Sequence, residues 1–372
     1  MRLNPPQRIL LINIFGIGDV LFTTPLINNL KAAYPDIFIG YLCNRRTIPL
    51  LEHNSKISRI FIYERDELET LRQKSAWQYL KAVRRLIQDI RGERFDMVLD
   101  VSLNSFMSFL AFAAGIPRRI GYDYKGRGIF LTQRIPLAGY EDRHVAEYYL
   151  DLLAAFGVPA QSRDMEFPLI PEDIQWAAEF LEENRISVRQ PAPPLAGQAG
   201  GAGWPVIGLI PGGGESWGKD AGYKRWPAEC FAKLADKLVE KKSATIILMG
   251  GLVELDLCEK TAQLMQNRPI ETCGKTSLGQ FAALMQRCSL VVTNDGGPLH
   301  VAVAVGAKTV SIFGPVDERV YGPYPLGNHI VIKKDIVCRP CYRQFRKASC
   351  EHISCLRQIT VEDVLERVEK IS

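Results

Sequence analysis

Two series of short apolar runs, each run followed by a turn and a helix-like segment, constrain the fold of this chain most strongly. The first series begins with residues 9–15, a continuous apolar run typical of a parallel strand that is buried on both faces. The second series begins with residues 206–210. Strands that alternate with helices in this way predict parallel sheets with helices on both faces. We therefore expect an α/β protein with two doubly wound, Rossmann-like domains that face an interdomain cleft.

A tract rich in proline, alanine and glycine, residues 190–203, separates the two series and offers little that could form a core. The 372 residues fit two domains. We expect an N-terminal domain over 1–188, a linker over 189–204 and a C-terminal domain over 205–355. A capped helix within 356–372 is expected to pack back on the N-terminal domain.

One long helix is predicted in the first series, over residues 71–91. Its apolar side chains recur at helical spacing and begin with Trp77 and Leu80, which places them together on one face. Basic side chains occupy the other faces of this helix, where they are expected to be solvated. They include Lys81, Arg84 and Arg85.

Composition narrows the class of protein. Hydrophobic residues make up 47% of the chain and charged residues 23%, an ordinary balance for a globular protein. The formal net charge of +5 is too small to indicate nucleic-acid binding. No apolar stretch reaches the ~20 residues that a membrane-spanning helix needs, and the first residues lack the apolar region of a signal peptide. We therefore expect a cytoplasmic protein whose nine cysteines do not form a disulfide framework.

The turn Gly16-Ile17-Gly18-Asp19 follows the first strand. It does not match the dinucleotide-binding pattern G-x-G-x-x-G, because Leu21 stands where the third glycine is required. Asp19 has two interpretations. It is either the cap of the following helix or a general base that accepts a proton from an attacking hydroxyl group.

The segment 211–227 leaves the first strand of the second series and carries three consecutive glycines. Consecutive glycines let backbone N–H groups approach an anion closely. Lys219, Lys224 and Arg225 are candidates to neutralise a phosphate. The alternative is a flexible surface loop. The segment is not a Walker loop, because G-x-x-x-x-G-K-[ST] does not occur in it.

The turn over residues 294–297 ends a buried strand, and a helix begins near Pro298. The N-terminus of that helix presents unpaired N–H groups and partial positive charge, which favour a diphosphate. On the alternative interpretation, Asp295 only caps the helix and His300 is a core residue. A further glycine turn precedes Glu254, whose carboxylate could either accept hydrogen bonds from a ribose or stabilise a helix N-terminus.

These turns, in this order, resemble those of glycosyltransferase family 9, the heptosyltransferase family. The resemblance extends along nearly the whole chain, and its most specific parts are the turns at 250–254 and 294–300. It also includes residues 9–30, Gly121 in Arg-Ile-Gly-Tyr, and the Lys-Arg-Trp-Pro sequence at 224–227. The resemblance implies a GT-B fold whose N-terminal domain binds the acceptor and whose C-terminal domain binds a nucleotide sugar.

The resemblance further implies an inverting, metal-independent enzyme that moves a heptose, or a related sugar, to the inner core of lipopolysaccharide. ADP-heptose is the expected nucleotide-diphospho-sugar donor. Asp19 would be the catalytic base, Lys224 would hold the diphosphate, and Glu254 would lie near the nucleoside. The other expected donor contacts are Gly213, Gly214, Ser216, Asp295, Gly296, Gly297 and His300. The alternatives are a nucleotide-sugar epimerase of the same fold and a nucleotide-binding module without catalysis.

The acceptor that the resemblance implies is an anionic lipid-linked oligosaccharide. Residues 70–134 carry twelve Lys or Arg and five Asp or Glu, a net charge of +7. Such a basic surface also favours peripheral attachment to an anionic membrane, here the cytoplasmic face of the inner membrane. No nucleic-acid partner is expected. The expected acceptor contacts are Gly18 and four basic residues that the sequence places in one glycine-containing loop: Arg118, Arg119, Lys125 and Arg127.

Metal-dependent glycosyltransferases commonly carry an Asp-x-Asp pair, and no two aspartates in this chain are separated by one residue. We therefore expect no metal at the reaction centre and no required cofactor. Near the C-terminus, four cysteines follow the spacing C-x2-C-x8-C-x4-C, with His352 between the last two. Cys338, Cys341, Cys350 and Cys355 are candidates for a structural zinc site, and free or partly oxidised thiols are the alternative.

Overall fold

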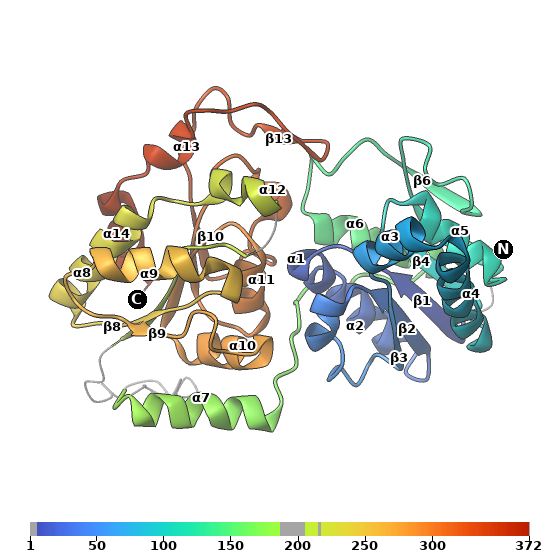
Figure 1. Cartoon of the computed structure of the whole chain (residues 1–372), viewed down its shortest axis with the longest axis horizontal. Helices are drawn as coiled ribbons and strands as arrows, with labels where there is room; N and C mark the ends of the chain where they lie inside the picture. Colours follow the sequence, from blue (N-terminus) through green and yellow to red (C-terminus); the bar gives the residue numbers. More distant parts are fainter. Residues whose placement is uncertain (1–5, 187–204, 215–216, 372) are drawn as a thin grey trace. The chain divides into compact units, whose positions relative to one another are not determined.

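The computed structural model describes residues 6–186, 205–214 and 217–371. The chain divides into two compact units, Met1–Glu166 and Phe167–Ser372 (Figure 1). Each unit contains a six-stranded parallel sheet, which confirms the predicted α/β class with two doubly wound domains. The expected linker, residues 189–204, and the candidate donor residue Ser216 lie outside the described residues.

The sheet of the first unit has the strand order β3-β2-β1-β4-β5-β6. Every neighbouring pair is parallel. β1 is Arg8–Ile12, and its last four residues are buried, as the apolar run predicts. The other strands are β2 (Phe38–Cys43), β3 (Arg59–Ile62), β4 (Met97–Asp100), β5 (Arg118–Tyr124) and β6 (Gln133–Leu137).

The helices of the first unit alternate with these strands. They are α1 (Ile17–Leu21), α2 (Thr24–Ala33), α3 (Arg65–Lys74), α4 (Ala76–Gly92), α5 (Ser105–Ala113) and α6 (Val145–Asp151), with short 3-10 helices η1 (Arg45–Leu50) and η2 (Leu152–Phe156). In the described parts of both units, no helix combines the length and the apolar character that crossing a membrane requires.

The single helix predicted over 71–91 is two helices, because the chain breaks at Ser75. Ser75 follows α3 and caps α4, and its hydroxyl accepts a hydrogen bond from the N–H of Gln78 at 3.4 Å. Leu80 at the N-terminal end of α4 is exposed, as is Trp77. The core of this unit contacts the face of α4 that carries Tyr79, Val83 and Ile90, and Val83 is buried there.

The sheet of the second unit has the order β12-β11-β10-β7-β8-β9, and its neighbours are again parallel. Its strands are β7 (Val206–Ile210), β8 (Thr245–Leu248), β9 (Ile270–Glu271), β10 (Leu290–Asn294), β11 (Thr309–Ile312) and β12 (His329–Ile332). A small antiparallel hairpin follows, made of β13 (Tyr342–Arg343) and β14 (Arg346–Lys347).

Helices of the second unit lie between these strands and at both ends of the unit. They are α7 (Pro171–Glu183), α8 (Ala228–Lys242), α9 (Leu255–Leu264), α10 (Leu278–Arg287), α11 (Gly297–Ala304), α12 (Glu318–Tyr321), α13 (Ser354–Arg357) and α14 (Val361–Ile371), with 3-10 helices η3 (Gly218–Lys224) and η4 (Leu252–Glu254).

Two helices depart from the expected domain limits. The sequence assigns α7 to an N-terminal domain over 1–188, but α7 packs against α10 and belongs to the second unit. The sequence also predicts that the C-terminal helix packs back on the N-terminal domain. Instead α14 packs on α8 within the second unit, because Val364, Leu365 and Val368 enter the core that α8 also lines.

Candidate active site

Three glycine-containing turns of the second unit follow β10, β7 and β8, which are neighbours in its sheet. Because these strands are parallel, the turns leave the same carboxyl edge, where doubly wound sheets bind their ligands. The turns include residues 295–297, 211–214 and 249–254. The sequence predicts that each of these turns binds a phosphate or a nucleotide, and the structure brings the three turns into contact.

Glycine is required where these turns pack against each other. Gly213 and Gly214 have φ angles of +97° and +85°, in the left-handed region that other residues rarely adopt. A Cβ atom on Gly296 would overlap the carbonyl oxygen of Gly213, and a Cβ atom on Gly212 would overlap the carboxylate of Glu254. The predicted donor residues Gly213, Gly214 and Gly296 are therefore brought together by close backbone packing.

Glu254 ties two of the turns together. It is 2% exposed. Its Oε1 accepts a hydrogen bond from the N–H of Gly214 at 2.7 Å, and its Oε2 accepts one from the N–H of Gly251 at 2.9 Å. The guanidinium Nη2 of Arg225 lies 3.9 Å from Oε1. The contacts of Glu254 thus hold the loops in place, and its contact with a nucleoside stays a prediction.

Lys224 and Asp295 form a buried ion pair beside these turns. The Nζ atom of Lys224 lies 2.9 Å from Oδ2 of Asp295, and the two side chains are 10% and 4% exposed. The ammonium group also lies 5.1 Å from the ring centroid of Trp217. Moving a charge out of water is costly unless it is paired, so each group of this pair requires the other. The pair holds a cation in a fixed position next to the start of α11.

Asn294, which the sequence did not mark as functional, joins the turn after β10 to the turn after β7. Its Nδ2 donates to the carbonyl oxygen of Pro211 at 2.7 Å, and its Oδ1 accepts from the N–H of Trp226 at 2.9 Å. Arg225, a predicted phosphate ligand, donates from Nε to the carbonyl oxygen of Gly212 at 3.0 Å. Both side chains therefore support the turns. The sequence indicated Arg225 only as a phosphate candidate and Asn294 only as part of the turn over residues 294–297.

The remaining predicted donor residues lie on α11 and η3. Gly297 begins α11, and His300 is buried within it, with 4% of its surface exposed. In the first turn of α11, Pro298 has no N–H group and Leu299 donates its own to the carbonyl oxygen of Gly296 at 3.1 Å, which leaves the N–H of Gly297 for a ligand. Lys219, in η3, is exposed and stands apart from the buried ion pair. The structure thus favours Lys224 over Lys219 as the cation of this site.

In the first unit, Asp19 lies in the first turn of α1, close to the carboxyl end of β1. Asn13 holds this turn, because its Nδ2 donates to the carbonyl oxygen of Asp19 at 2.9 Å and its Oδ1 accepts from the N–H of Phe15 at 3.0 Å. A Cβ atom on Gly16 would lie 3.9 Å from Oδ2 of Asp19 and 3.7 Å from Nη2 of Arg46. The carboxylate and this guanidinium group therefore flank the same point of the turn. Arg46 does not belong to any sequence motif, so its position beside Asp19 could not be predicted from the sequence.

Three buried tyrosines lie within electrostatic range of Asp19: Tyr41, Tyr140 and Tyr149. Burial raises the pKa of each phenol well above its usual value, and the negative charge of Asp19 adds to this effect. The hydroxyl of Tyr41 also lies 2.9 Å from the hydroxyl of Thr23. The phenols near Asp19 therefore stay neutral at physiological pH.

Asp100, the last residue of β4, is a buried carboxyl that the sequence did not mark as functional. It pairs in register with Ile12, close to the turn that carries Asp19. Burial raises the pKa of Asp100 to about 6, although Ser102 donates to its Oδ1 from the backbone N–H at 2.9 Å and from the hydroxyl at 2.6 Å. A Cβ atom on Gly121 would overlap the carbonyl oxygen of Asp100, which is why Arg-Ile-Gly-Tyr needs its glycine.

The four basic residues expected to form one acceptor-binding loop do not lie in one loop. Arg118 and Arg119 begin β5 at its amino end, whereas Lys125 and Arg127 follow its carboxyl end. The five strand residues between Arg119 and Lys125 separate the two pairs by roughly 20 Å. Only Lys125 and Arg127 follow the carboxyl edge of the sheet, the edge that Asp19 follows. The prediction of a single cluster was wrong because residues 118–124 are a buried strand.

Arg119 is engaged within the first unit. Its guanidinium donates to the carbonyl oxygen of Phe130 at 2.6 Å and to that of Ile116 at 2.5 Å. Burial lowers the pKa of Arg119. Its contacts are those of a structural residue, whereas Lys125 and Arg127 are exposed. Acceptor binding by these residues stays a prediction.

The four C-terminal cysteines come together in the second unit. Cys338, Cys341, Cys350 and Cys355 are free thiols and line one small pocket with His352. Burial raises the pKa of Cys355 to about 11, and the other three thiols add to this effect. Within the described ranges, no three or more His, Cys, Asp or Glu side chains are arranged as a ready metal-ligand set. The structural zinc therefore stays a prediction.

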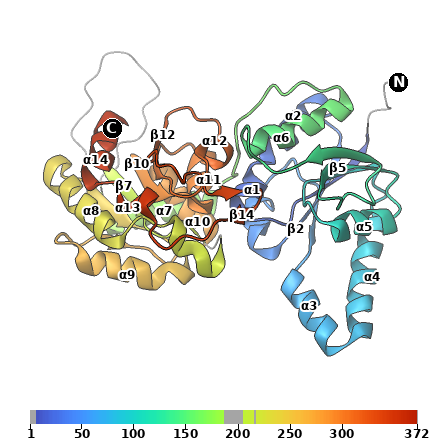
Figure 2. The ribbon, with the colours of Figure 1, turned by 90° about the horizontal axis from the view of Figure 1, so that it is seen from above.

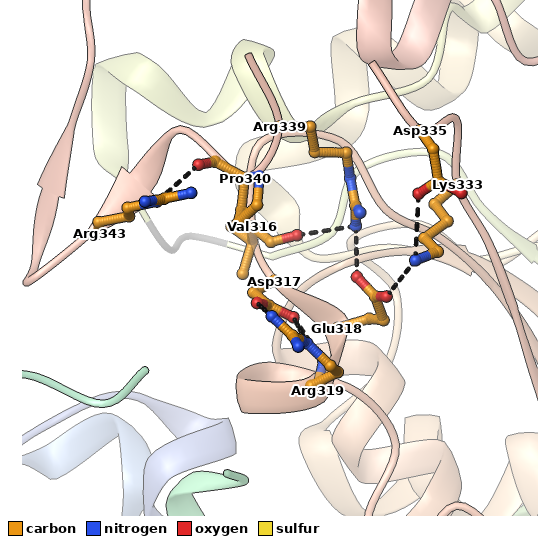
Figure 3. Close-up of polar contacts among 9 residues, drawn as sticks. All are labelled: Val316, Asp317, Glu318, Arg319, Lys333, Asp335, Arg339, Pro340 and Arg343. Carbon is orange, nitrogen blue, oxygen red and sulfur yellow. Dashed lines mark hydrogen bonds and ion pairs between the residues drawn. The ribbon is translucent and has the colours of Figure 1, made fainter. Parts of the chain in front are cut away.

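A network of ion pairs fixes the segment that carries these cysteines (Figure 3). Arg339 donates from Nε to the carbonyl oxygen of Gly314 at 2.7 Å and from Nη2 to that of Val316 at 3.0 Å. It also pairs with Glu318 at 2.6 Å, and Lys333 binds the same carboxylate at 2.7 Å. Burial alone would raise the pKa of Glu318, but the hydrogen bonds from Lys333 and Arg339 outweigh it and hold the pKa below its usual value. Protein contacts thus anchor this segment.

Solved structures share the whole fold. A family 9 glycosyl transferase from Veillonella parvula DSM 2008 covers 100% of this chain and 98% of its own, with a TM-score of 0.77 at 24% identity. The Escherichia coli ADP-heptose lipopolysaccharide heptosyltransferase II covers 98% of each chain, with a TM-score of 0.73 at 22% identity. These likenesses confirm the GT-B fold.

Curated relatives are heptosyltransferases. Lipooligosaccharide heptosyltransferase 2 of Campylobacter jejuni is 32% identical over 171 residues, which are 45% of this chain and 51% of the relative. The chain thus spans about half the length of this relative. Lipopolysaccharide heptosyltransferase 3 of Escherichia coli K12 is 24% identical over 311 residues, 82% of each chain. The family model of glycosyltransferase family 9 (heptosyltransferase) matches residues 83–352. The chain belongs to this family.

Proposed function

We propose that this protein transfers a heptose from ADP-heptose to the inner core of lipopolysaccharide. The observation that carries the proposal is the family match over residues 83–352. The ammonium group of Lys224, which Asp295 holds beside the start of α11, is the cation that would face a diphosphate donor. Two Escherichia coli WaaC structures of related fold, with TM-scores of 0.69 and 0.68, contain ADP and ADP-2-deoxy-2-fluoro heptose.

The second unit is proposed to hold the donor. Lys224 and the N–H of Gly297 at the start of α11 would bind the diphosphate, with Asp295 keeping the ammonium group in position. Gly213 and Gly297 are proposed to contact phosphate oxygens through their backbone N–H groups. Glu254 would set the shape of the nucleoside pocket through the loops that it joins.

The first unit is proposed to supply the general base and to bind an anionic lipid-linked oligosaccharide. A hydroxyl of the acceptor attacks the anomeric carbon of the donor sugar, and Asp19 takes the hydroxyl proton. The bond from that carbon to the diphosphate oxygen breaks, and ADP leaves. Lys224 and the N-terminus of α11 stabilise the charge that develops on the leaving group. Because this is a single displacement, the anomeric configuration is inverted.

No metal is proposed at the reaction centre, because Lys224 and the start of α11 would supply the positive charge that an Asp-x-Asp-bound metal supplies in other glycosyltransferases.

The four-cysteine pocket is a separate proposal, a structural zinc site. Elemental analysis of the purified protein tests it, with Cys341→Ser as the variant and Cys288→Ser, a buried thiol outside the pocket, as the control. One zinc per wild-type chain, lost only in Cys341→Ser, supports the site. A metal-free wild-type chain contradicts it.

Calorimetry with ADP, UDP, GDP and CMP, each with and without EDTA, tests the donor assignment. Selective binding of ADP that EDTA does not weaken supports a metal-independent enzyme that uses ADP-heptose. Preference for UDP or GDP contradicts that donor, and absence of binding contradicts the donor site itself.

Dependence on the acceptor separates the transferase from its two alternatives. A transferase consumes ADP-heptose and releases ADP only when acceptor is present. An epimerase converts the donor sugar without an acceptor, and a binding module binds the nucleotide without turnover. Chromatography of the nucleotide products, with and without acceptor, distinguishes these three outcomes.

A further inference from the structure

The N-terminal end of α4 exposes two large apolar side chains. Trp77 is 69% exposed and Leu80 is 62% exposed. α3 and α4 pack together as a helical hairpin that extends away from the sheet of the first unit (Figure 2), and no residue of α3 is buried. The core of the unit contacts another face of α4, through Tyr79, Val83 and Ile90. Trp77 and Leu80 therefore lie on the face of α4 that the core does not cover.

The same end of the hairpin is strongly basic. Residues 70–88 contain five basic residues and no acidic residue. Glu69 lies just outside this range and pairs with Arg72 at 2.7 Å. In the described parts of the chain, no ion pair joins the basic residues of 76–88 to a carboxylate. The five basic residues, all exposed, are Arg72, Lys74, Lys81, Arg84 and Arg85.

Apolar and basic side chains share one face of α4. Trp77, Lys81 and Arg84 are spaced by three and four residues, so they lie above one another on the helix, with Leu80 beside them. The Nζ atom of Lys81 lies 5.2 Å from the ring centroid of Trp77. Tryptophan and leucine among basic residues on one exposed helix face are typical of helices that lie at the surface of an anionic membrane.

We propose that this face, made of Trp77, Leu80, Lys81, Arg84 and Arg85, docks the protein on an anionic lipid bilayer. Two apolar side chains are too few for the core of a stable protein interface, which buries about 800 Å² on each partner. They suffice at a bilayer, where indole and leucine enter the headgroup region and each basic residue adds attraction to anionic lipid. This proposal rests on the proposed function, because a lipid-linked acceptor lies at a membrane surface and docking would bring the enzyme to it.

Sedimentation with vesicles tests the docking face. Wild-type protein should bind vesicles of phosphatidylethanolamine and phosphatidylglycerol, bind neutral phosphatidylcholine vesicles at least tenfold less, and lose binding as salt increases. The triple variant Lys81→Glu, Arg84→Glu, Arg85→Glu should bind the anionic vesicles about 100-fold less, since each basic residue contributes roughly a factor of five. The variant Trp77→Ser, Leu80→Ser should also lose at least tenfold.

A matched control distinguishes the effect of this face from the effect of the protein's net charge. The triple variant Lys242→Glu, Arg268→Glu, Lys275→Glu makes the same change in charge at exposed positions of the second unit. It should bind anionic vesicles within threefold of wild type. Loss as large as that of the α4 triple variant would overturn the proposal, as would failure of the wild type to bind anionic vesicles. All substituted side chains are exposed, and unchanged thermal unfolding and ADP binding show that each variant is folded.

Two acceptors distinguish this proposal from the proposed function. The α4 triple variant should keep wild-type transfer to a water-soluble, deacylated acceptor and lose transfer to the acceptor in anionic vesicles. Equal transfer to both acceptors would contradict docking by this face. Absence of transfer to either acceptor in the wild type would contradict the proposed function, whereas vesicle binding would still report on docking.

Discussion

The Nζ atom of Lys224 lies 2.9 Å from Oδ2 of Asp295, in a pair that is almost fully buried. The pair stands where the turns after β7 and β10 meet, and only Gly296 separates Asp295 from the start of α11. A cation held in this way needs no rearrangement to face a diphosphate, because its carboxylate partner already fixes it. The pair therefore links the stability of the second unit to its proposed chemistry.

Replacing Lys224 with alanine should destabilise the protein and abolish transfer. The substitution leaves the carboxylate of Asp295 buried without its cation, which costs about 3–5 kcal/mol. The double variant Lys224→Ala, Asp295→Asn should recover most of that stability and none of the activity. Urea denaturation measures the first effect, and kcat should fall by roughly 10²–10³ in both variants. Recovery of activity in the double variant would contradict a role for Lys224 on the leaving group.

Replacing Asp19 with asparagine should remove the general base and leave the donor site intact. The expected loss in kcat is about 10²–10⁴-fold, with ADP affinity unchanged. Asp36→Asn, at an exposed position of the same unit, is the matched control and should retain full activity. If Asp19→Asn transfers heptose at the wild-type rate, Asp19 is not the base.

Replacing Gly296 with alanine should separate the turns that form the donor site. The added Cβ atom overlaps the carbonyl oxygen of Gly213, so one turn must move. We expect a loss of about 1–3 kcal/mol in unfolding free energy and at least a tenfold loss of ADP affinity. Gly222→Ala is the control, because a Cβ atom at Gly222 meets nothing within 4 Å and its φ is not in the left-handed region. Equal ADP affinity in both variants would show that this packing does not shape the site.

Asp100 should make stability fall as pH rises. Burial raises its pKa from 3.8 to about 6. The native state therefore holds the proton more tightly than the unfolded state, so the contribution is complete below pH 3.8 and is lost as pH rises through 6. At about 1.36 kcal/mol for each unit of pKa, Asp100→Asn should gain about 2 kcal/mol relative to wild type between pH 4 and pH 7.

Urea denaturation of wild type and Asp100→Asn across this pH range measures the difference. Asp89→Asn, an exposed carboxyl on α4, serves as the control and should show no such gain. A constant difference between wild type and Asp100→Asn from pH 4 to pH 7 would show that Asp100 titrates normally.

The sequence predicted those parts of the site that local geometry determines. A buried strand that ends in a glycine turn places Asp19, Gly213 and Asp295 at strand ends whatever the rest of the chain does. The left-handed glycines and the helix that starts at Gly297 follow from the same local pattern. Fold class and family could therefore be predicted without the structure.

Other features depend on contacts between distant segments. Asn294 and Arg225 support turns whose backbone partners lie elsewhere in the chain, and nothing in their own sequence shows it. Arg118 and Arg119 look like neighbours of Lys125 until the strand between them is known. The exposure of Trp77 depends on where Ser75 breaks the helix, which periodicity alone did not show.

The most direct test of the account is the reaction itself. Purified protein is incubated with ADP-heptose and a lipopolysaccharide inner-core acceptor in EDTA, and the product is examined by mass spectrometry and by NMR of its new anomeric centre. We expect one added heptose, one ADP released per transfer, and an anomeric configuration opposite to that of the donor. Retention of the donor configuration, or no transfer until a divalent metal is added, would contradict it.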